Sequence, residues 1–207
     1  MIDRLPRRLR VAFNHPDADH DAAPEPTPPT EDRLPEVAFV AYGEDCILSG
    51  RTSLDADRLS DMLNGHEEYA LVGVTVDRLD GGAPIRVDEI VVPRDELFMV
   101  HASGPRGDRR RRQHTTPQHI AVKMGPYQIR GFFHGVPGND PVLAIGRRKS
   151  MVPLTNARIS YERAGDPCET TVDVLIVNRE QIDWIAEIEP DRAEFPTGPK
   201  VAVPHPA

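Results

Sequence analysis

The feature that most limits how this chain can fold is an internal repeat. Residues Val87–Val100 align without a gap on Val172–Ile185, with four identical and six conservative positions among the 14. Upstream, AFVAYG matches IAVKMG, and EYALVGVTV stands opposite SMVPLTNAR. Segments that recur in the same order indicate a duplicated structural unit. We therefore predict two copies of one unit, at 37–101 and at 119–187.

Each copy contains five short segments that have the composition of β-strands. In the first copy they are EVAFVAY, CILSGRTSL, EYALVGVTVDRL, IRVDEIVV and ELFMV, and turn-forming residues separate them. Strands this short and numerous bend or close to cover their edges. We expect a mainly β protein of two tandem five-stranded modules, each a small barrel of the SH3-like or Sm-like kind.

One short helix is predicted, in the first copy only. Residues 55–64 place Leu59, Met62 and Leu63 at helical spacing, with an aspartate available as N-cap and a glycine at the end. The second copy has GVPGNDPVLAIGRRKS in this place. Its prolines and glycines disfavour a regular helix at the start, leaving at most a turn at VLAI.

Proline and acidic residues gather at the two ends of the chain. Seven of the 21 prolines fall in residues 1–36 and five in 190–207. Segments so poor in apolar side chains cannot offset the entropy of ordering. We expect a disordered arm at 1–35, an exposed basic linker at 102–118 and a disordered tail at 188–207. No apolar run could span a bilayer and no signal peptide is evident, so the expected location is cytoplasmic.

Three short motifs carry a resemblance to a known family. LSDMLN, PLTNA and VNREQI begin at Leu59, Pro153 and Val177. They resemble the signature pieces of a bacterial family of domains of unknown function, in which a YRIxG-type strand, LSDxLN, PLTxA and VNRxxI follow one another in one small β unit. The second copy lacks LSDxLN, and the first has LVGVT and VPRDEL in place of the last two pieces. The resemblance implies a tandem version of that unit and implies no activity.

The only dense basic cluster lies in the predicted linker. It consists of Arg106, Arg109, Arg110, Arg111 and Arg112. Arginine suits phosphate geometry, so this cluster is a candidate for binding phosphate or a partner. The simpler interpretation is a solvated linker, because no aromatic residues surround the cluster for base stacking. The formal net charge of -8 also opposes nonspecific attraction to nucleic acid.

No motif assigns a reaction, a cofactor or a metal. GxSxG, GxGxxG and GxxxxGK[ST] are absent, and Cys46 and Cys168 form no metal-binding or nucleophile pattern. The histidines and aspartates between His15 and Asp21 fall in the predicted arm, where nothing fixes the geometry of metal ligands. We expect no catalytic residue, no cofactor and no metal site.

Four charged residues recur at equivalent positions of the two copies. They are Asp88 and Arg94 in the first copy and Asp173 and Arg179 in the second. Because the copies have otherwise diverged, a shared turn or ion pair explains this better than a ligand site. We therefore predict a structural role for these four residues.

Composition and motifs together favour a non-enzymatic binding or assembly protein. The acidic balance points to a protein partner or to self-association, and not to a membrane. The alternative is a nucleic-acid-associated regulator that uses the arginine cluster.

Overall fold

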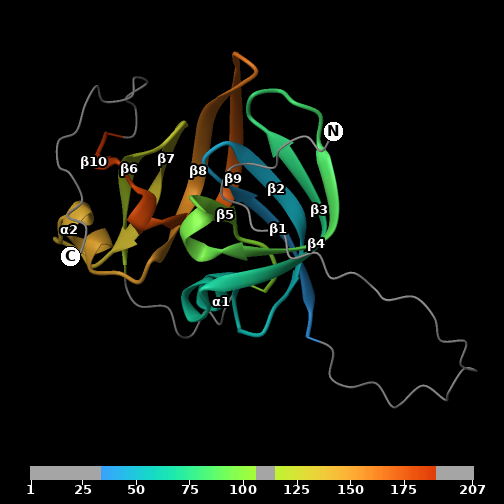
Figure 1. Ribbon diagram of the computed structural model, residues 1–207. Coiled ribbons are helices and arrows are strands. Elements are labelled where there is room, and N and C mark those ends of the chain that lie inside the picture. Colours follow the sequence, from blue (N-terminus) through green and yellow to red (C-terminus); the bar gives the residue numbers. More distant parts are fainter. Residues whose placement is uncertain (1–33, 106–114, 190–207) are drawn as a thin grey trace, which may run out of the picture.

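The computed structural model describes residues 34–105 and 115–189, which form ten strands, two α-helices and two 3-10 helices (Figure 1). The first half contains β1 (Glu36–Tyr42), β2 (Cys46–Ser53), α1 (Leu59–Gly65), β3 (Glu68–Arg78), β4 (Ile85–Pro93), η1 (Arg94–Glu96) and β5 (Met99–His101). The second half contains β6 (Thr116–Met124), β7 (Tyr127–Gly135), α2 (Pro141–Gly146), β8 (Met151–Arg163), β9 (Asp166–Asn178), η3 (Arg179–Gln181) and β10 (Trp184–Glu187).

All ten strands belong to one antiparallel sheet. Their order across the sheet is β10-β6-β7-β8-β9-β5-β1-β2-β3-β4. The mainly β fold expected from the sequence is confirmed. Two separate five-stranded barrels are not confirmed, because β5 pairs with β9 and so joins the halves, while β4 and β10 end an open sheet.

The same order of elements occurs in both halves of the described chain. Each half is a four-strand meander with a helix after the second strand and a 3-10 turn after the fourth. In each half the fifth strand then returns beside the first, β5 beside β1 and β10 beside β6. The pairing registers also correspond, since Phe39 lies opposite Gly50 just as Ile120 lies opposite Gly131.

A β-bulge recurs at the third strand of each half. The register shifts between Ser49 and Arg51 on β2, and again between Arg130 and Phe132 on β7. Opposite these shifts stand Gly73, with φ of 59°, and Asn156, with φ of 48°. Glycine and asparagine are the residues that best tolerate this left-handed conformation, so both halves bend at the same place.

The bulge corrects one part of the sequence alignment. Leu71 pairs with Ile90 and Leu154 pairs with Leu175. The alignment of Val87–Val100 with the second copy already matches Ile90 to Leu175. Leu71 therefore corresponds to Leu154, one residue beyond the position that the ungapped comparison of EYALVGVTV with SMVPLTNAR gave it.

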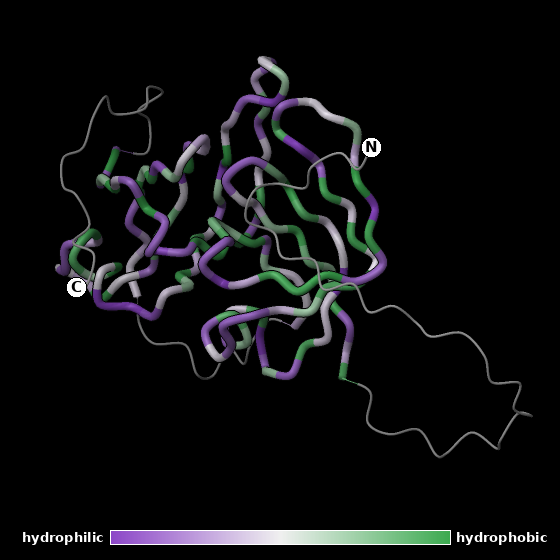
Figure 2. Tube along the Cα trace, in the orientation of Figure 1, coloured by the Kyte–Doolittle hydropathy of each residue, from purple (hydrophilic) through white to green (hydrophobic). Residues whose placement is uncertain are grey.

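Apolar side chains fill two core clusters, one over each half. The first contains Phe39, Leu48 and Leu71, and the second contains Ile129, Phe133 and Leu154. Figure 2 shows the apolar stretches along the strands and the polar residues at the hairpin ends. The clusters also exchange residues: Met151 of β8 packs in the first, and Met99 of β5 packs in the second. The two halves are thus held together by core packing as well as by strand pairing.

The predicted helix of the first copy is confirmed at α1, where Leu59, Met62 and Leu63 are buried. Its N-cap is not an aspartate. Arg58 takes that position and makes no side-chain capping bond. Asp55 instead lies 2.7 Å from the Nε2 atom of His66 at the other end of the helix.

The second half also contains a helix, α2, where the sequence predicted at most a turn. Asp140 is its N-cap and accepts hydrogen bonds from the backbone N–H groups of Val142 and Leu143. Pro141 occupies the first turn, where a missing N–H costs nothing and the fixed φ is already helical. The proline that was interpreted as a helix breaker is therefore a helix starter.

Candidate protein-interaction edges

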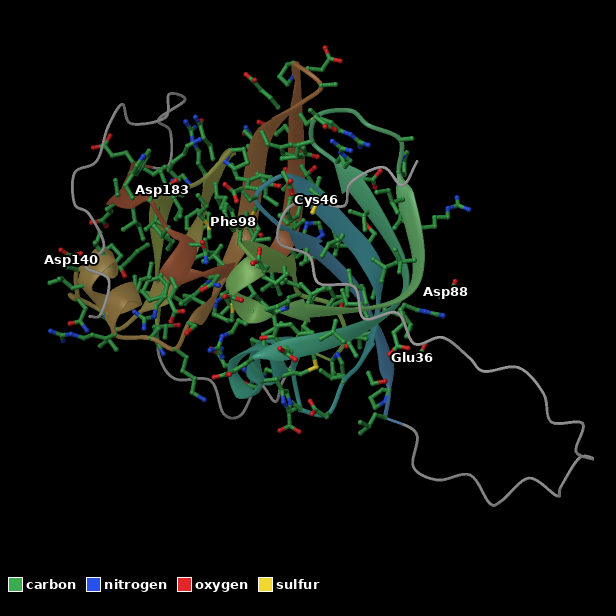
Figure 3. All side chains as sticks on the ribbon, viewed as in Figure 1. Glu36, Cys46, Asp88, Phe98, Asp140 and Asp183 are labelled. Carbon is green, nitrogen blue, oxygen red and sulfur yellow. The ribbon has the colours of Figure 1, made fainter. Side chains whose placement is uncertain are left out.

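The two outer strands of the sheet are the candidate interaction sites. Within residues 34–105 and 115–189, β4 pairs only with β3, and β10 pairs only with β6. Figure 3 places Asp88 of β4 and Asp183, which precedes β10, on opposite sides of the molecule. An edge strand presents N–H and C=O groups that another strand can pair with. The protein thus offers two such edges, facing away from each other.

The residues of the edges combine an apolar core side with charges. On β4, Ile90 and Val92 are buried, while Asp88 and Glu89 are exposed. On β10, Ile185 and Ala186 are buried and Glu187 is exposed. Exposed charges on an edge discourage unspecific strand addition while leaving the backbone available to a partner in the right register.

The junction between β5 and β9 shows what such an edge does when it is paired. Met99, Val100 and His101 lie opposite Val177, Ile176 and Leu175. The ladder continues at both ends, where Ala102 N donates to Val174 O at 3.0 Å and Asn178 N donates to Phe98 O at 2.8 Å. Although β5 is only three residues long, every one of its positions is paired across the junction.

Asn178, the last residue of β9, stabilises this junction through its side-chain hydrogen bonds. Its side chain is completely buried. The Nδ2 group donates to Arg94 O at 3.1 Å and to Leu97 O at 3.0 Å, so it holds both ends of the η1 turn. Its Oδ1 atom accepts from Glu180 N at 3.2 Å. A buried amide with three partners fixes the relative position of the two halves more specifically than apolar packing alone.

Asn64, at the end of α1, makes a second polar link across the junction. Its Nδ2 group donates to Met151 O at 2.8 Å, and its Oδ1 atom accepts from Met151 N at 3.0 Å. The amide therefore binds the first residue of β8 as a neighbouring strand would. The sequence patterns predict no role for Asn64 or Asn178, although both residues stand in the motifs LSDMLN and VNREQI.

Aromatic residues pack at the same junction. Tyr42 stacks edge-on against Tyr127, with 5.4 Å between ring centroids, and its hydroxyl lies 3.0 Å from Nε2 of His101. Tyr127 donates to Gly43 O at 2.9 Å. Burial raises the pKa of Tyr42 to about 12 and raises that of Tyr127, while burial lowers the pKa of His101. Near neutral pH these side chains are uncharged and act as packing groups.

An acidic depression of about 520 Å³ lies beside the end of β4. It is lined by Glu67, Glu68, Pro93, Arg94, Asp95, Glu96 and Glu180. In the described part of the chain no group of three or more His, Cys, Asp and Glu side chains is placed to hold a metal ion. Its five carboxylates make the depression a negatively charged surface next to the β4 edge.

The repeat-equivalent arginines make matching contacts. Arg94 N donates to Glu67 O, and its Nη1 group donates to His66 O at 3.1 Å. Arg179 N donates to Ser150 O, and its Nη1 group donates to Gly146 O at 3.0 Å. Each arginine thus ties a 3-10 turn to the end of the helix of its own half or to the residues just after it.

The two repeat-equivalent aspartates, Asp88 and Asp173, are exposed on β4 and β9. The predicted phosphate- or partner-binding arginines, Arg106, Arg109, Arg110, Arg111 and Arg112, lie outside the described residues. The histidines and aspartates between His15 and Asp21 also lie outside them.

The two cysteines are free. Cys46 is buried, and burial raises the pKa of its thiol to about 12, which leaves it protonated and unreactive at neutral pH. In the residues that the structure covers, no helix is long and apolar enough to cross a membrane.

Comparison with protein-family models, with curated proteins and with solved structures finds no match for this chain. The resemblance to the family of small β domains stays a prediction. The candidate site is therefore defined by the sheet itself, which has one paired internal junction, β5 with β9, and two outer edges, β4 and β10.

Proposed function

We propose that this chain is a non-enzymatic assembly protein, built from two tandem β modules, that binds partner proteins through the β4 and β10 edges. The observation that carries the proposal is the junction between β5 and β9, where strand pairing at an edge already joins two β units. Each unit has the connectivity that a small barrel needs, with the fifth strand beside the first. Adding a strand to an exposed edge is a common way for proteins to bind extended segments.

Charge favours a protein as the partner. The chain carries a formal net charge of -8, and the depression beside β4 is lined by five carboxylates. Phosphate backbones would be repelled from such a surface, whereas basic protein segments would be attracted. This supports a protein partner over the nucleic-acid alternative, which depends on arginines outside the described residues.

Site-specific crosslinking in the producing cell tests the proposal. A photo-reactive amino acid replaces Glu89 on β4 or Glu187 on β10, both of which are exposed. The matched control replaces Arg158, an exposed residue on β8 that pairs with Arg130 on one side and with Thr171 on the other. We expect light-dependent adducts with protein at the two edge positions and none at the control.

Two results would count against an assembly role at the edges. Equal adduct formation at all three positions would mean that contact with protein is unspecific. Adducts with nucleic acid instead of protein at Glu89 and Glu187 would favour the alternative function.

A further inference from the structure

We propose that the partner at these edges is a second copy of this chain, and that β10 of one copy pairs antiparallel with β4 of the next. This inference rests on the proposed function and names its partner. The resulting contact is head to tail, since one copy contributes its β10 edge and the other its β4 edge. A contact of this type leaves one free edge of each kind, so it extends until a ring closes or a filament forms.

The internal junction supplies the template. β10 occupies the place in the second half that β5 occupies in the first, because Ile185 lies opposite Val122 just as Val100 lies opposite Ala41. β4 likewise corresponds to β9 through the sequence repeat. Each chain therefore carries, at its two outer edges, the equivalents of the two strands that already pair inside it. Transferring the register of β5 and β9 predicts three pairs between copies: Trp184 with Val92, Ile185 with Val91, and Ala186 with Ile90.

The backbone of β4 is oriented for this pairing. On β9, Asn178 N donates to Phe98 O and Val174 O accepts from Ala102 N, so the N–H of Ile176, midway between them, is also directed to β5. Val91 is the equivalent residue and lies opposite Ala70 in the same register. Its N–H is therefore directed away from β3, toward the outer edge, where Ile185 of a second copy would accept it.

Charge complementarity supports the same arrangement. Inside the chain, the end of α1 covers the start of β8, through Asn64 and Met151. The corresponding surface of the first half is the acidic depression that includes Glu68. The corresponding helix is α2, which contacts β10 and is followed by the exposed residues Arg147, Arg148 and Lys149. Pairing β10 with β4 brings this basic loop of one copy to the acidic depression of the next.

The contact between copies is weaker than the internal junction. Pro93 stands where β9 has Asn178, so the bonds from that amide have no counterpart. Extending the register also places Glu187 opposite Glu89 of the next copy, a repulsive cross-strand pair. We therefore expect association that is reversible and depends on protein concentration and on salt.

Sedimentation of the full-length chain tests the strand pairing. Over about a hundredfold range of concentration, the mass should rise from the 23.0 kDa of one chain to multiples of it. Val91→Pro removes the outward N–H and should hold the mass at one chain. Val87→Pro is the matched control, because Val87 has the same backbone orientation, opposite Val74, but lies beyond the predicted ladder. Circular dichroism verifies that both variants stay folded.

Charge reversal gives a gain of association, and its reversal on dilution distinguishes it from aggregation of a misfolded chain. Glu89→Lys converts the repulsive pair with Glu187 into an attractive one and should tighten association about threefold. The double variant Arg147→Glu and Arg148→Glu removes the basic loop's charge, so it should weaken the association of copies and reduce the salt dependence of that association.

Disulfide trapping tests the register. A Glu187→Cys chain is mixed with a Glu89→Cys chain, both carrying Cys168→Ser, and oxidation should give a covalent dimer. A mixture of Glu187→Cys with Asp88→Cys is the control, since Asp88 is also exposed but its side chain lies on the opposite face of the strand. Equal trapping in both mixtures would overturn the proposed register.

A chain that sediments as a monomer at every concentration would overturn this inference. It would not decide the proposed function, which the cellular crosslinks at Glu89 and Glu187 decide separately. Adducts with a different protein, together with a monomeric purified chain, would keep the assembly role and exclude the second copy as its partner.

Discussion

The paired junction at the centre of the sheet, β5 with β9, and the outer edges, β10 and β4, are built from equivalent strands that carry different side chains. At the junction, β5 and β9 are joined by three residue pairs and by Asn178, which binds two carbonyls of the opposite half. At the β4 edge, Pro93 takes the equivalent position. The comparison indicates that strand pairing defines which edges of two units can associate. The hydrogen bonds of a buried amide then stabilise the internal contact specifically.

The helices follow the same division. Asn64 at the end of α1 binds the backbone of Met151 across the junction. α2 has the apolar Ile145 at the corresponding turn, and basic residues come directly after it. Hydrogen bonds of neutral amide side chains stabilise the internal junction, whereas charged side chains predominate near the outer edges. Long-range charge attraction is suited to a reversible contact, because it accelerates encounter and adds little to lifetime.

The largest effect should come from removing the amide that closes the junction. Asn178→Ala leaves the carbonyls of Arg94 and Leu97 buried without this donor, so we expect the free energy of unfolding to fall by about 2–3 kcal/mol. Pro93→Ala is the matched outer variant and should cost less than about 1 kcal/mol. Urea denaturation followed by circular dichroism measures both. Equal losses would remove the distinction between junction and edge.

A smaller effect is expected at the second polar link. Asn64→Ala removes both bonds to the backbone of Met151 and should lower the free energy of unfolding by about 1–2 kcal/mol. The control is Asp61→Ala, an exposed position on the same helix, which should change stability by less than about 0.5 kcal/mol. If the two variants lose the same stability, the effect belongs to α1 itself and not to the junction.

Much of this architecture could be predicted from the sequence. Alternating apolar residues specified most of the strands, and the spacing of Leu59, Met62 and Leu63 specified α1. The junction could not be predicted, because pairing of β5 with β9 depends on long-range contacts that no local pattern encodes. α2 was missed for a different reason. Asp140 followed by Pro141 is a helix start signal, because proline is unfavourable inside a helix and favourable in its first turn.

Two of the motifs behind the family resemblance contain the asparagines that link the two halves. LSDMLN ends in Asn64 and VNREQI begins beside Asn178, and the structure brings these two asparagines to one junction from opposite halves. Sequence alone shows that an asparagine is present. It does not show that its side chain is buried and bonded to a backbone from the other half of the chain.

The pH dependence of stability should sharpen the comparison further. Burial lowers the pKa of His101 at the junction and of His119 on β6, so the folded state favours the neutral rings. The free energy of unfolding therefore keeps its full value above the unfolded-state pKa of histidine, about 6.5, and decreases as the pH falls below it. His101→Gln should flatten the loss of stability between neutral and acidic pH, by at most about 1.4 kcal/mol per pH unit. Thermal melts at several pH values measure the slope, and His119→Gln separates the two rings. An unchanged slope in His101→Gln would place the titrating group elsewhere.

The smallest effect is expected where the hairpin tips of the two halves meet. Arg163 on β8 lies 3.1 Å from Asp77 on β3, and both side chains are partly exposed, at 38% and 27%. Water screens such a pair, so a double-mutant cycle of Arg163→Ala and Asp77→Ala should give a coupling of about 0–1 kcal/mol that shrinks at high salt. Next to this pair, Ala164 N donates to Leu79 O, a backbone bond that neither substitution removes. A coupling energy well above this range would mean that water is excluded from the hairpin tips and that the specific junction extends to them. A small coupling would mean that this ion pair adds little to stability and that backbone and apolar contacts hold the tips together.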